Sequence, residues 1–316
     1  MTEVLTSVEG TGAVEARVSP FLLKPKFAGR IWGKADLKPW YSDTGVDGPV
    51  GEAWLTGPEC VVATGPHAGK TMQEMASIFP SQLGHGEYPL LVKMLFPSDK
   101  LSVQVHPDDD EAKKLGLPRG KTECWYVLEA EPEAKVACGI LPGVTLEDLR
   151  AALADGTLED KLEIVPVKAG DMVFVDAGTV HAIGPGLVLL EVQQTCDVTY
   201  RLYDYGRARD LHLEEGLAVV KLQTEAGKIE SSVESGFTRL IKTKYFVVDR
   251  FVVTPGDALE MPMDGIGCII GLHGEAAVNG VEFGPGQAVV MPVGSAALSS
   301  RHGATVMRCW EPVKQI

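Results

Sequence analysis

The sequence predicts a mainly β protein that contains two related barrels or sandwiches. Its 35 glycines and 20 prolines separate many short runs rich in Val, Ile and Leu, which is typical of all-β sandwiches and barrels. Helical spacing is confined to a few short segments, at 71–83, 145–156 and 211–221. One sequence frame also occurs twice, and this repeat indicates two copies of the same β unit.

Strands are expected over most of the remaining chain, at 88–96, 100–106, 122–130, 135–140, 163–167, 171–176, 186–193 and 246–254. The strand that ends at Pro107 has two different faces, because side chains alternate along a strand. Ser102, Gln104 and His106 share one face, and apolar residues occupy the other. The acids after Pro107 are typical of the first turn of a helix. This strand therefore presents polar side chains near a rim.

The segments 170–184 and 286–300 carry the repeat. Each begins with a glycine, continues with one polar and three apolar residues, and has another glycine eight positions after the first. On this frame His181 aligns with Ala297, and no carboxylate in the second copy corresponds to Glu123. The second copy keeps the glycines that turns require but lacks the polar side chains. The fold alone therefore does not require His181 and Glu123.

These observations predict three parts of the chain. Residues 1–19 form a flexible N-terminal segment, and residues 20–238 form a metal-binding catalytic domain that includes the helices. Residues 239–316 form a degenerate copy without metal ligands. Both folded parts have lengths that are usual for one domain.

The composition limits the class of protein. Hydrophobic residues make up 45% of the chain and charged residues 23%, close to the averages for globular proteins. The net charge of −14 argues against a nucleic-acid surface, which needs clustered Lys and Arg. No apolar run is long enough to span a membrane and the first residues do not resemble a secretory signal, so we expect a cytoplasmic protein. Six cysteines without a C-x-x-C pair fit a reducing compartment.

Gln104, His106, Glu123 and His181 form the first constellation. They supply two imidazoles, a carboxylate and an amide oxygen, on segments that one β unit would bring side by side. Such a set suits zinc, iron or manganese and leaves room for substrate or water. A single histidine on a strand is more often a core or surface residue than a ligand. The four residues together, and their absence from the second copy, favour a metal site.

The segment 189–207 is the second constellation, with acids, tyrosines and arginines crowded along a strand and its continuation. It could be an edge with surface ion pairs, which contribute little to stability. Arg201 could instead grip a phosphate at two points or stabilise negative charge on a reacting oxygen. Lys93 is a lone charge in the apolar run "LLVKML", and it could also extend its ammonium to the mouth of the β unit.

Four motifs occur in order along the chain: "LSVQVHPDD", "GKTECWYVL", "DAGTVHAIG" and "EVQQTCDVTYRLYDYGR". Together they resemble the type I mannose-6-phosphate isomerases, specifically the short bacterial form. The segments "LKPKFAGRIWG" and "GEAWLTG" are similar to N-terminal signatures of that family. Several ordered motifs at compatible spacing are a more specific signal than one short match.

The resemblance implies a cupin fold with two jelly-roll-like repeats, and an enzyme with one zinc ion per chain that interconverts mannose 6-phosphate and fructose 6-phosphate. The family's functional positions fall here on the zinc ligands His106, Glu123, His181 and Gln104, and on the catalytic residues Arg201, Lys121 and Asp197. We expect Lys93, Ser102 and Glu191 to bind the phosphorylated hexose. Long members of the family have a tyrosine soon after the second metal histidine, whereas this chain has Ile183.

Several alternatives stay open at this point. Asp197, Glu191, Lys121 or a metal-bound water could be the base that moves a proton between two sugar carbons. Two histidines and a carboxylate on a small β unit are also the ligands of non-haem iron oxygenases. A non-catalytic sugar-phosphate-binding cupin is the other alternative. The sequence leaves the oligomeric state open.

Overall fold

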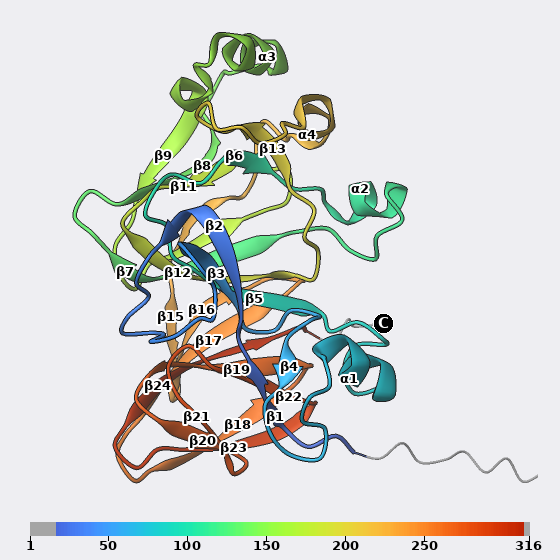
Figure 1. Cartoon of the computed structure of the whole chain (residues 1–316), viewed down its shortest axis with the longest axis vertical. Helices are drawn as coiled ribbons and strands as arrows, with labels where there is room; N and C mark the ends of the chain where they lie inside the picture. The colour runs from blue at the N-terminus through green and yellow to red at the C-terminus, as the bar shows by residue number, and fades with distance from the viewer. Residues whose placement is uncertain (1–16, 313–316) are drawn as a thin grey trace, which may run out of the picture.

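A computed structural model describes residues 17–312 as a stack of four β-sheets (Figure 1). Residues 1–16, most of the expected flexible segment, lie outside the described residues. The first sandwich consists of a seven-stranded and a five-stranded sheet, and the second sandwich consists of an eight-stranded and a four-stranded sheet. The two large sheets lie in the middle of the stack, so the two sandwiches pack back to back (Figure 1).

The first sandwich carries most of the polar motifs. Its seven-stranded sheet has the order β14 (Gly227–Ile229), β10 (Met172–Val175), β7 (Glu123–Ala130), β12 (Leu187–Gln194), β5 (Leu90–Leu95), β3 (Val50–Trp54) and β2 (Lys26–Lys34). Its five-stranded sheet has the order β13 (Tyr200–Tyr203), β6 (Val103–Val105), β11 (His181–Ile183), β8 (Lys135–Ile140) and β9 (Leu162–Pro166).

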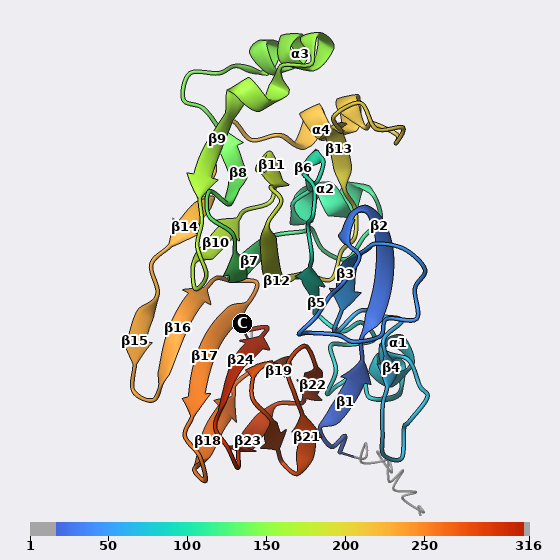
Figure 2. The same cartoon turned by 60° about the vertical axis from the view of Figure 1, so that its left-hand side comes forward.

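The second sandwich combines the C-terminal strands with two strands from the start of the chain. Its eight-stranded sheet has the order β15 (Ser232–Glu234), β16 (Phe237–Lys242), β17 (Val247–Val253), β24 (Ala304–Trp310), β19 (Gly267–His273), β22 (Ala288–Met291), β1 (Phe21–Lys24) and β4 (Val61–Val62), which Figure 2 shows from left to right. Its four-stranded sheet has the order β18 (Ala258–Met263), β23 (Gly294–Ser299), β20 (Ala276–Val278) and β21 (Val281–Phe283).

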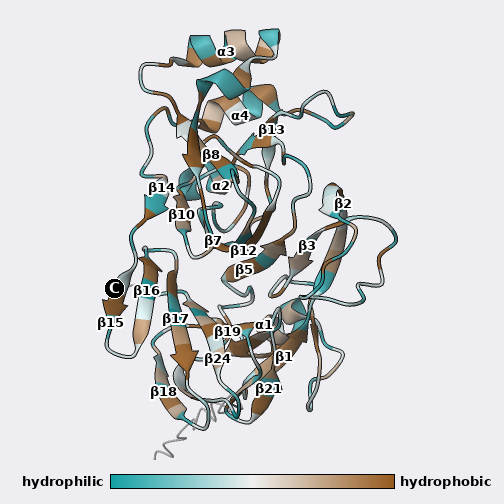
Figure 3. Cartoon of the chain, turned by 90° about the vertical axis from the view of Figure 1, so that its left-hand side faces the viewer, coloured by the Kyte–Doolittle hydropathy of each residue, from teal (hydrophilic) through white to brown (hydrophobic). Residues whose placement is uncertain are grey.

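Apolar layers fill the spaces between the sheets. Met94 of β5 and Cys268 of β19 belong to the layer between the two large sheets, and both are buried. Trp125 and Val136 lie in the core of the first sandwich, and Ile269 lies in the core of the second. Strands such as β12 and β17 are accordingly hydrophobic over most of their length, whereas α3 alternates between hydrophilic and hydrophobic residues (Figure 3).

Within residues 17–312, four short helices lie outside the sheets: α1 (Met72–Ile78), α2 (Asp109–Lys114), α3 (Leu146–Asp155) and α4 (Leu213–Val219), with a 3-10 turn η1 (Leu158–Lys161) after α3. The helices at 71–83, 145–156 and 211–221 are thus confirmed. Thr71 and Thr145 each form a capping box with an acid in the first turn, which supplies partners for free backbone N–H groups. Asp108 is the N-cap of α2, and its side chain accepts hydrogen bonds from Asp110 N and Glu111 N.

The mainly β class is confirmed, and every strand expected above is present within a few residues of its expected bounds. The sheets are not closed barrels, because each one has two edge strands. The repeats are therefore two-sheet sandwiches of the jelly-roll kind. The division into domains at 238 stays a prediction; β1, β4 and β15 also belong to the large sheet of the second sandwich. No helix within residues 17–312 has the length and apolar character needed to span a membrane.

Candidate metal centre and substrate pocket

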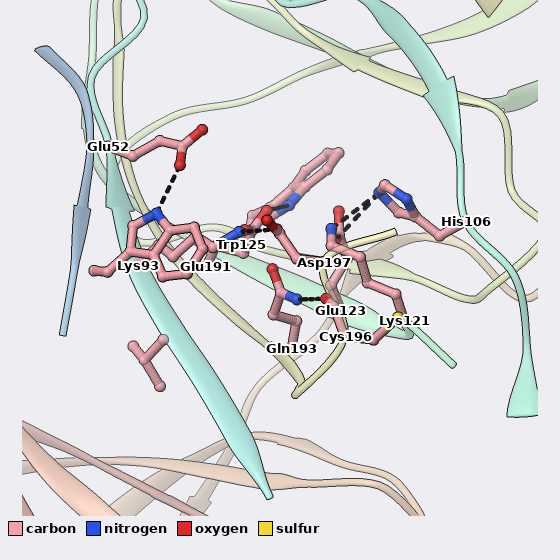
Figure 4. A network of polar contacts seen from close by, with 12 residues as sticks. Glu52, Lys93, His106, Lys121, Glu123, Trp125, Glu191, Gln193, Cys196 and Asp197 are labelled. Atoms are coloured by element: carbon pink, nitrogen blue, oxygen red, sulfur yellow. Dashed lines mark hydrogen bonds and ion pairs between the residues drawn. The ribbon is translucent and has the colours of Figure 1, made fainter. Parts of the chain in front are cut away.

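Three strands of the first sandwich bring His106, Glu123 and His181 together. His106 directly follows β6, Glu123 begins β7 and His181 begins β11. One ligand atom from each residue lies within 4.8 Å of the others. All three side chains are at most 1% exposed. Three residues from distant motifs thus form a single buried cluster. Figure 4 shows two of them, His106 and Glu123, beside Lys121.

The hydrogen bonds of the two imidazoles orient them for metal binding. His106 Nδ1 lies 3.0 Å from Val198 O, and His181 Nδ1 lies 2.9 Å from Thr179 O. A ring N–H that donates to a carbonyl leaves Nε2 as the free lone pair. The Nε2 atoms lie 3.6 Å and 3.5 Å from the two carboxylate oxygens of Glu123. The free lone pairs therefore converge on the carboxylate.

Burial favours the protonation states that bind metals. It lowers the pKa of His181 to about 4, and burial together with the charge of Lys121 lowers the pKa of His106 well below its usual value. Both imidazoles are therefore neutral at pH 7, which is the form that ligates a metal. Glu123 Oε1 is buried without a hydrogen-bond partner, and such a group is costly unless something binds it. The donor set fits a divalent cation.

Two further polar side chains border this cluster. Gln104 Nε2 lies 3.3 Å from His181 Nε2, so the side chain of Gln104 borders the cluster, and its role as a fourth ligand stays a prediction. Lys121 is buried, contacts Glu123 Oε2, and lies 3.0 Å from His106 Nε2. Burial lowers the pKa of Lys121, but the charges of Glu123 and Glu191 outweigh this and raise it overall. His106 Nε2 has one lone pair, so it accepts from Lys121 or binds a metal, not both.

A cavity of about 480 Å³ opens beside the cluster. Seven of the ten predicted site residues line it: Lys93, Ser102, Gln104, Lys121, Glu191, Asp197 and Arg201. The other three are the buried cluster itself. Ile183, the position where long family members differ, is also part of the wall.

Lys93 does not extend its ammonium to solvent, since the residue is only 4% exposed. It lies opposite Glu191 in the β5–β12 pairing, and its Nζ lies 3.7 Å from Glu191 Oε1 and 3.1 Å from Asp197 Oδ1. Glu191 Oε2 also accepts a hydrogen bond from Trp125 Nε1 at 3.2 Å. Burial raises the pKa of Glu191, and the charge of Glu123 raises it further. Figure 4 shows Lys93, Trp125, Glu191 and Asp197 close together.

The cations around the cavity differ in how well they are neutralised. Four of them contact carboxylates: Arg30 contacts Glu52, Lys93 contacts Glu191 and Asp197, Lys121 contacts Glu123, and Arg209 contacts Asp204. Among the lining residues within 17–312, Arg201 is the one cation without a carboxylate contact. Its Nη1 donates to Asp210 O at 2.7 Å, and its Nε is buried without a partner. An anion in the cavity would find its free donors on Arg201.

Arg30, Glu52 and Arg209 also line the cavity, and the sequence patterns predicted no role for them. Arg30 and Glu52 form a two-point ion pair of 2.9 Å and 3.0 Å across β2 and β3. The one available signal was Glu52 itself, a carboxylate within the strand "VGEAW". Arg209 had no such signal, because its two contacts with Asp204 arise from a turn after β13.

Comparisons with known proteins find relatives of this chain. The family model "Phosphomannose isomerase type I, catalytic domain" matches residues 21–144. The mannose-6-phosphate isomerase ManA of Bacillus subtilis is 35% identical over 263 residues, covering 76% of this chain and 82% of that protein. The mannose-6-phosphate isomerase of Streptococcus mutans is 34% identical, covering 74% and 79%.

A solved structure shows that the likeness extends through both sandwiches. The crystal structure of the mannose 6-phosphate isomerase from Bacillus subtilis superposes with a TM-score of 0.79 at 28% identity, and the match covers 92% of this chain and 99% of that chain. The relatives above exceed 30% identity over most of their own length. The chain belongs to the type I phosphomannose isomerase family.

Proposed function

We propose that this protein is a metal-dependent isomerase that interconverts mannose 6-phosphate and fructose 6-phosphate through an enediolate. The observation that carries the proposal is the position of Arg201, which contacts no carboxylate, on a cavity that adjoins the buried cluster of His106, Glu123 and His181. A sugar phosphate needs a cationic anchor, and its isomerisation needs charge stabilisation at neighbouring oxygens. The named activity of the relatives supports the same assignment.

His106, Glu123 and His181 would hold one zinc ion, with Gln104 beside them as a further ligand. Imidazole and carboxylate ligands suit zinc, although they also suit iron and manganese. When bound, zinc supplies a Lewis acid that polarises and anchors the sugar oxygens. The chain's own residues perform the remaining tasks.

Arg201 and Lys121 supply positive charge to the substrate. Arg201 has a free Nε and no competing carboxylate, so its guanidinium can bind a phosphate or an enediolate oxygen at two points. Lys121 lies on the cavity wall, next to the metal ligands. These groups offset the net charge of −14 locally, so that the cleft can attract a dianion.

The reaction moves one proton from C2 of mannose 6-phosphate to C1, while a hydroxyl proton passes from O2 to O1. We assign the carbon-to-carbon transfer to Asp197, whose carboxylate lines the cavity and is 58% exposed. Glu191 has both oxygens engaged, by Trp125 and by Lys93. Its role is then to hold Lys93, which together with the buried Ser102 completes the substrate-binding wall.

We also place the enzyme in the cytoplasm. Its six cysteines are all free and buried, which is usual for a protein of a reducing compartment. The phosphorylated hexose is the one partner that this proposal requires.

A coupled assay for fructose 6-phosphate, started with mannose 6-phosphate, tests the proposal. Activity should disappear after chelation and return when zinc is added. Absence of turnover in the fully metallated protein would refute the isomerase. Oxygen uptake with iron would then favour the non-haem oxygenase, and sugar-phosphate binding without turnover would favour a binding protein. The cations around the cavity favour an anionic sugar phosphate and so argue against the oxygenase.

A further inference from the structure

The residues that follow His106 connect all three segments that carry the ligands. His106 is joined through Pro107 to Asp108 and Asp109, at the start of α2. Lys121 N donates to Pro107 O at 2.9 Å, which ties this segment to the strand of Glu123. The two aspartates each make a further link through their side chains.

Asp109 holds the segment of Glu123. Its Oδ1 accepts from Gly120 N and from Gln194 Nε2, both at 2.9 Å. Gln194 Oε1 in turn accepts from Thr122 N at 3.0 Å. Gly120 packs so tightly on the backbone of residues 107–108 that a β-carbon there would overlap it. Asp109 therefore fixes the start of β7 against the segment that carries His106.

Asp108 and Lys221 hold the segment of His181. Lys221 Nζ lies 2.9 Å from Asp108 Oδ2, and Lys221 N donates to Gly178 O at 2.9 Å. A β-carbon on Gly178 would lie 2.7 Å from Cγ and Cδ of Lys221, so the lysine stem packs directly on this turn. Gly178 N donates to His106 O at 2.9 Å. The turn before His181 is thus held from two sides.

We propose that Asp108, Asp109 and Lys221 are positioning residues that fix the three ligand segments and thereby raise the affinity for the metal. The inference rests on the proposed metal site and deepens it. Partners of the ligands commonly change metal affinity by about 10-fold to 100-fold when they are removed. The Lys221–Asp108 pair is also partly exposed, at 42% and 27%, and such pairs contribute little to global stability. Its loss should therefore change metal affinity much more than folding.

Lys221→Met tests this in the full-length protein, because methionine keeps the apolar stem over Gly178 and removes the ammonium. We expect zinc affinity, measured by competition with a chromogenic chelator, to fall about 10-fold, with the melting temperature of the metal-free protein unchanged. The visible spectrum of the Co²⁺ form should also change. Lys242→Met is the matched control, since Lys221 and Lys242 line one cavity of about 750 Å³ that is separate from the substrate cavity. The zinc affinity of Lys242→Met should match that of the wild type.

Two further variants make the test sharper. Asp108→Asn keeps the oxygen that caps α2 but weakens the ion pair, so its effect and that of Lys221→Met should not add in the double variant. Lys221→Arg should restore most of the affinity. Asp109→Ala, which removes the links to Gly120 and Gln194, should weaken zinc binding by at least as much as Lys221→Met.

Zinc affinity within about twofold of the wild type in both Lys221→Met and Asp109→Ala would overturn the inference. So would a loss of affinity that is matched by unfolding of the metal-free protein. Zinc affinity is measured independently of catalysis. A wild type that binds zinc tightly but does not turn over mannose 6-phosphate would refute the proposed reaction, whereas the zinc affinities of the variants alone decide this inference.

Discussion

The two sandwiches share one strand arrangement and differ in what they do with the polar residues inside it. The order β10-β7-β12-β5 in the first large sheet corresponds to β22-β19-β24-β17 in the second. In the first, Glu191 lies opposite Lys93. In the second, Arg308 lies opposite Asp249. A cross-strand charge pair thus occupies the same place in both sandwiches, with the charges exchanged.

The second pair is fully enclosed and satisfied. Asp249 is not exposed and is bound by Arg239 and by Arg308, whose Nη2 lies 2.6 Å from Oδ2. Arg308 also contacts Pro262 O and stacks over the Phe251 ring at 5.1 Å. In the first sandwich the corresponding pair faces a cavity and a carboxylate with a free oxygen. A buried charge pair is therefore a feature of the fold, and free donors beside a cavity distinguish the functional copy.

The backbone explains why the second copy carries no ligands. Glu123 pairs with Val175, and the equivalent pair in the second sandwich is Gly267 with Met291. A β-carbon on Gly267 would overlap Cys309 O, so no carboxylate fits there. Ala297, which the repeat aligns with His181, is exposed, whereas the residues on either side of it are buried in the core. After the turn, the aligned position therefore faces the interior in the first sandwich and solvent in the second.

The largest effect that separates the copies should come from His181→Ala. Without one of three convergent ligands, the protein should lose its metal and its isomerase activity together. Metal analysis and the coupled assay on the same sample measure both. A variant that stays fully metallated and active would contradict the ligand assignment.

Arg201→Ala should reduce kcat/KM by about 10²-fold to 10³-fold, because it removes the free cation while the metal stays bound. Arg301→Ala is the control: this arginine lies on the second sandwich and is exposed, so activity should match the wild type. Near-normal turnover of Arg201→Ala would exclude Arg201 from the mechanism.

Arg308→Met should affect stability and leave catalysis intact. Removal of one partner from a buried ion pair costs about 3 kcal/mol, and Asp249 would keep only Arg239. Urea unfolding should show the loss, while kcat and zinc content of the folded protein should not change. A reduced kcat at urea concentrations too low to unfold the protein would show that the second sandwich takes part in the chemistry.

Ala297→His should have the smallest effect, because it adds an imidazole at an exposed position of β23. Exposed substitutions of this kind usually change stability by less than about 0.5 kcal/mol. Metal analysis should still find one ion per chain, the content that we expect for the wild type from its single His106, Glu123 and His181 cluster within residues 17–312. Binding of a second ion would mean that the two copies are more alike than the exposed position of Ala297 indicates.

Local sequence patterns predicted most of the strands and helices, because alternation and capping residues act over a few positions. The cluster of His106, Glu123 and His181 was predictable from its residue types and from the motifs that resemble the family. The roles of Arg30, Arg209 and Lys221 were not, because their contacts join strands and turns that are distant in sequence. The pairing of Lys93 with Glu191 likewise needs the β5–β12 register, which the hydrophobic pattern of each strand alone does not specify.

A zinc titration of the metal-free protein, followed by the rate of fructose 6-phosphate formation, tests most directly whether the chemistry depends on the one cluster in the first sandwich. We predict that the rate rises from background in proportion to added zinc and reaches its plateau at one ion per chain. Turnover in the metal-free protein, or a plateau that requires a second ion, would contradict the account.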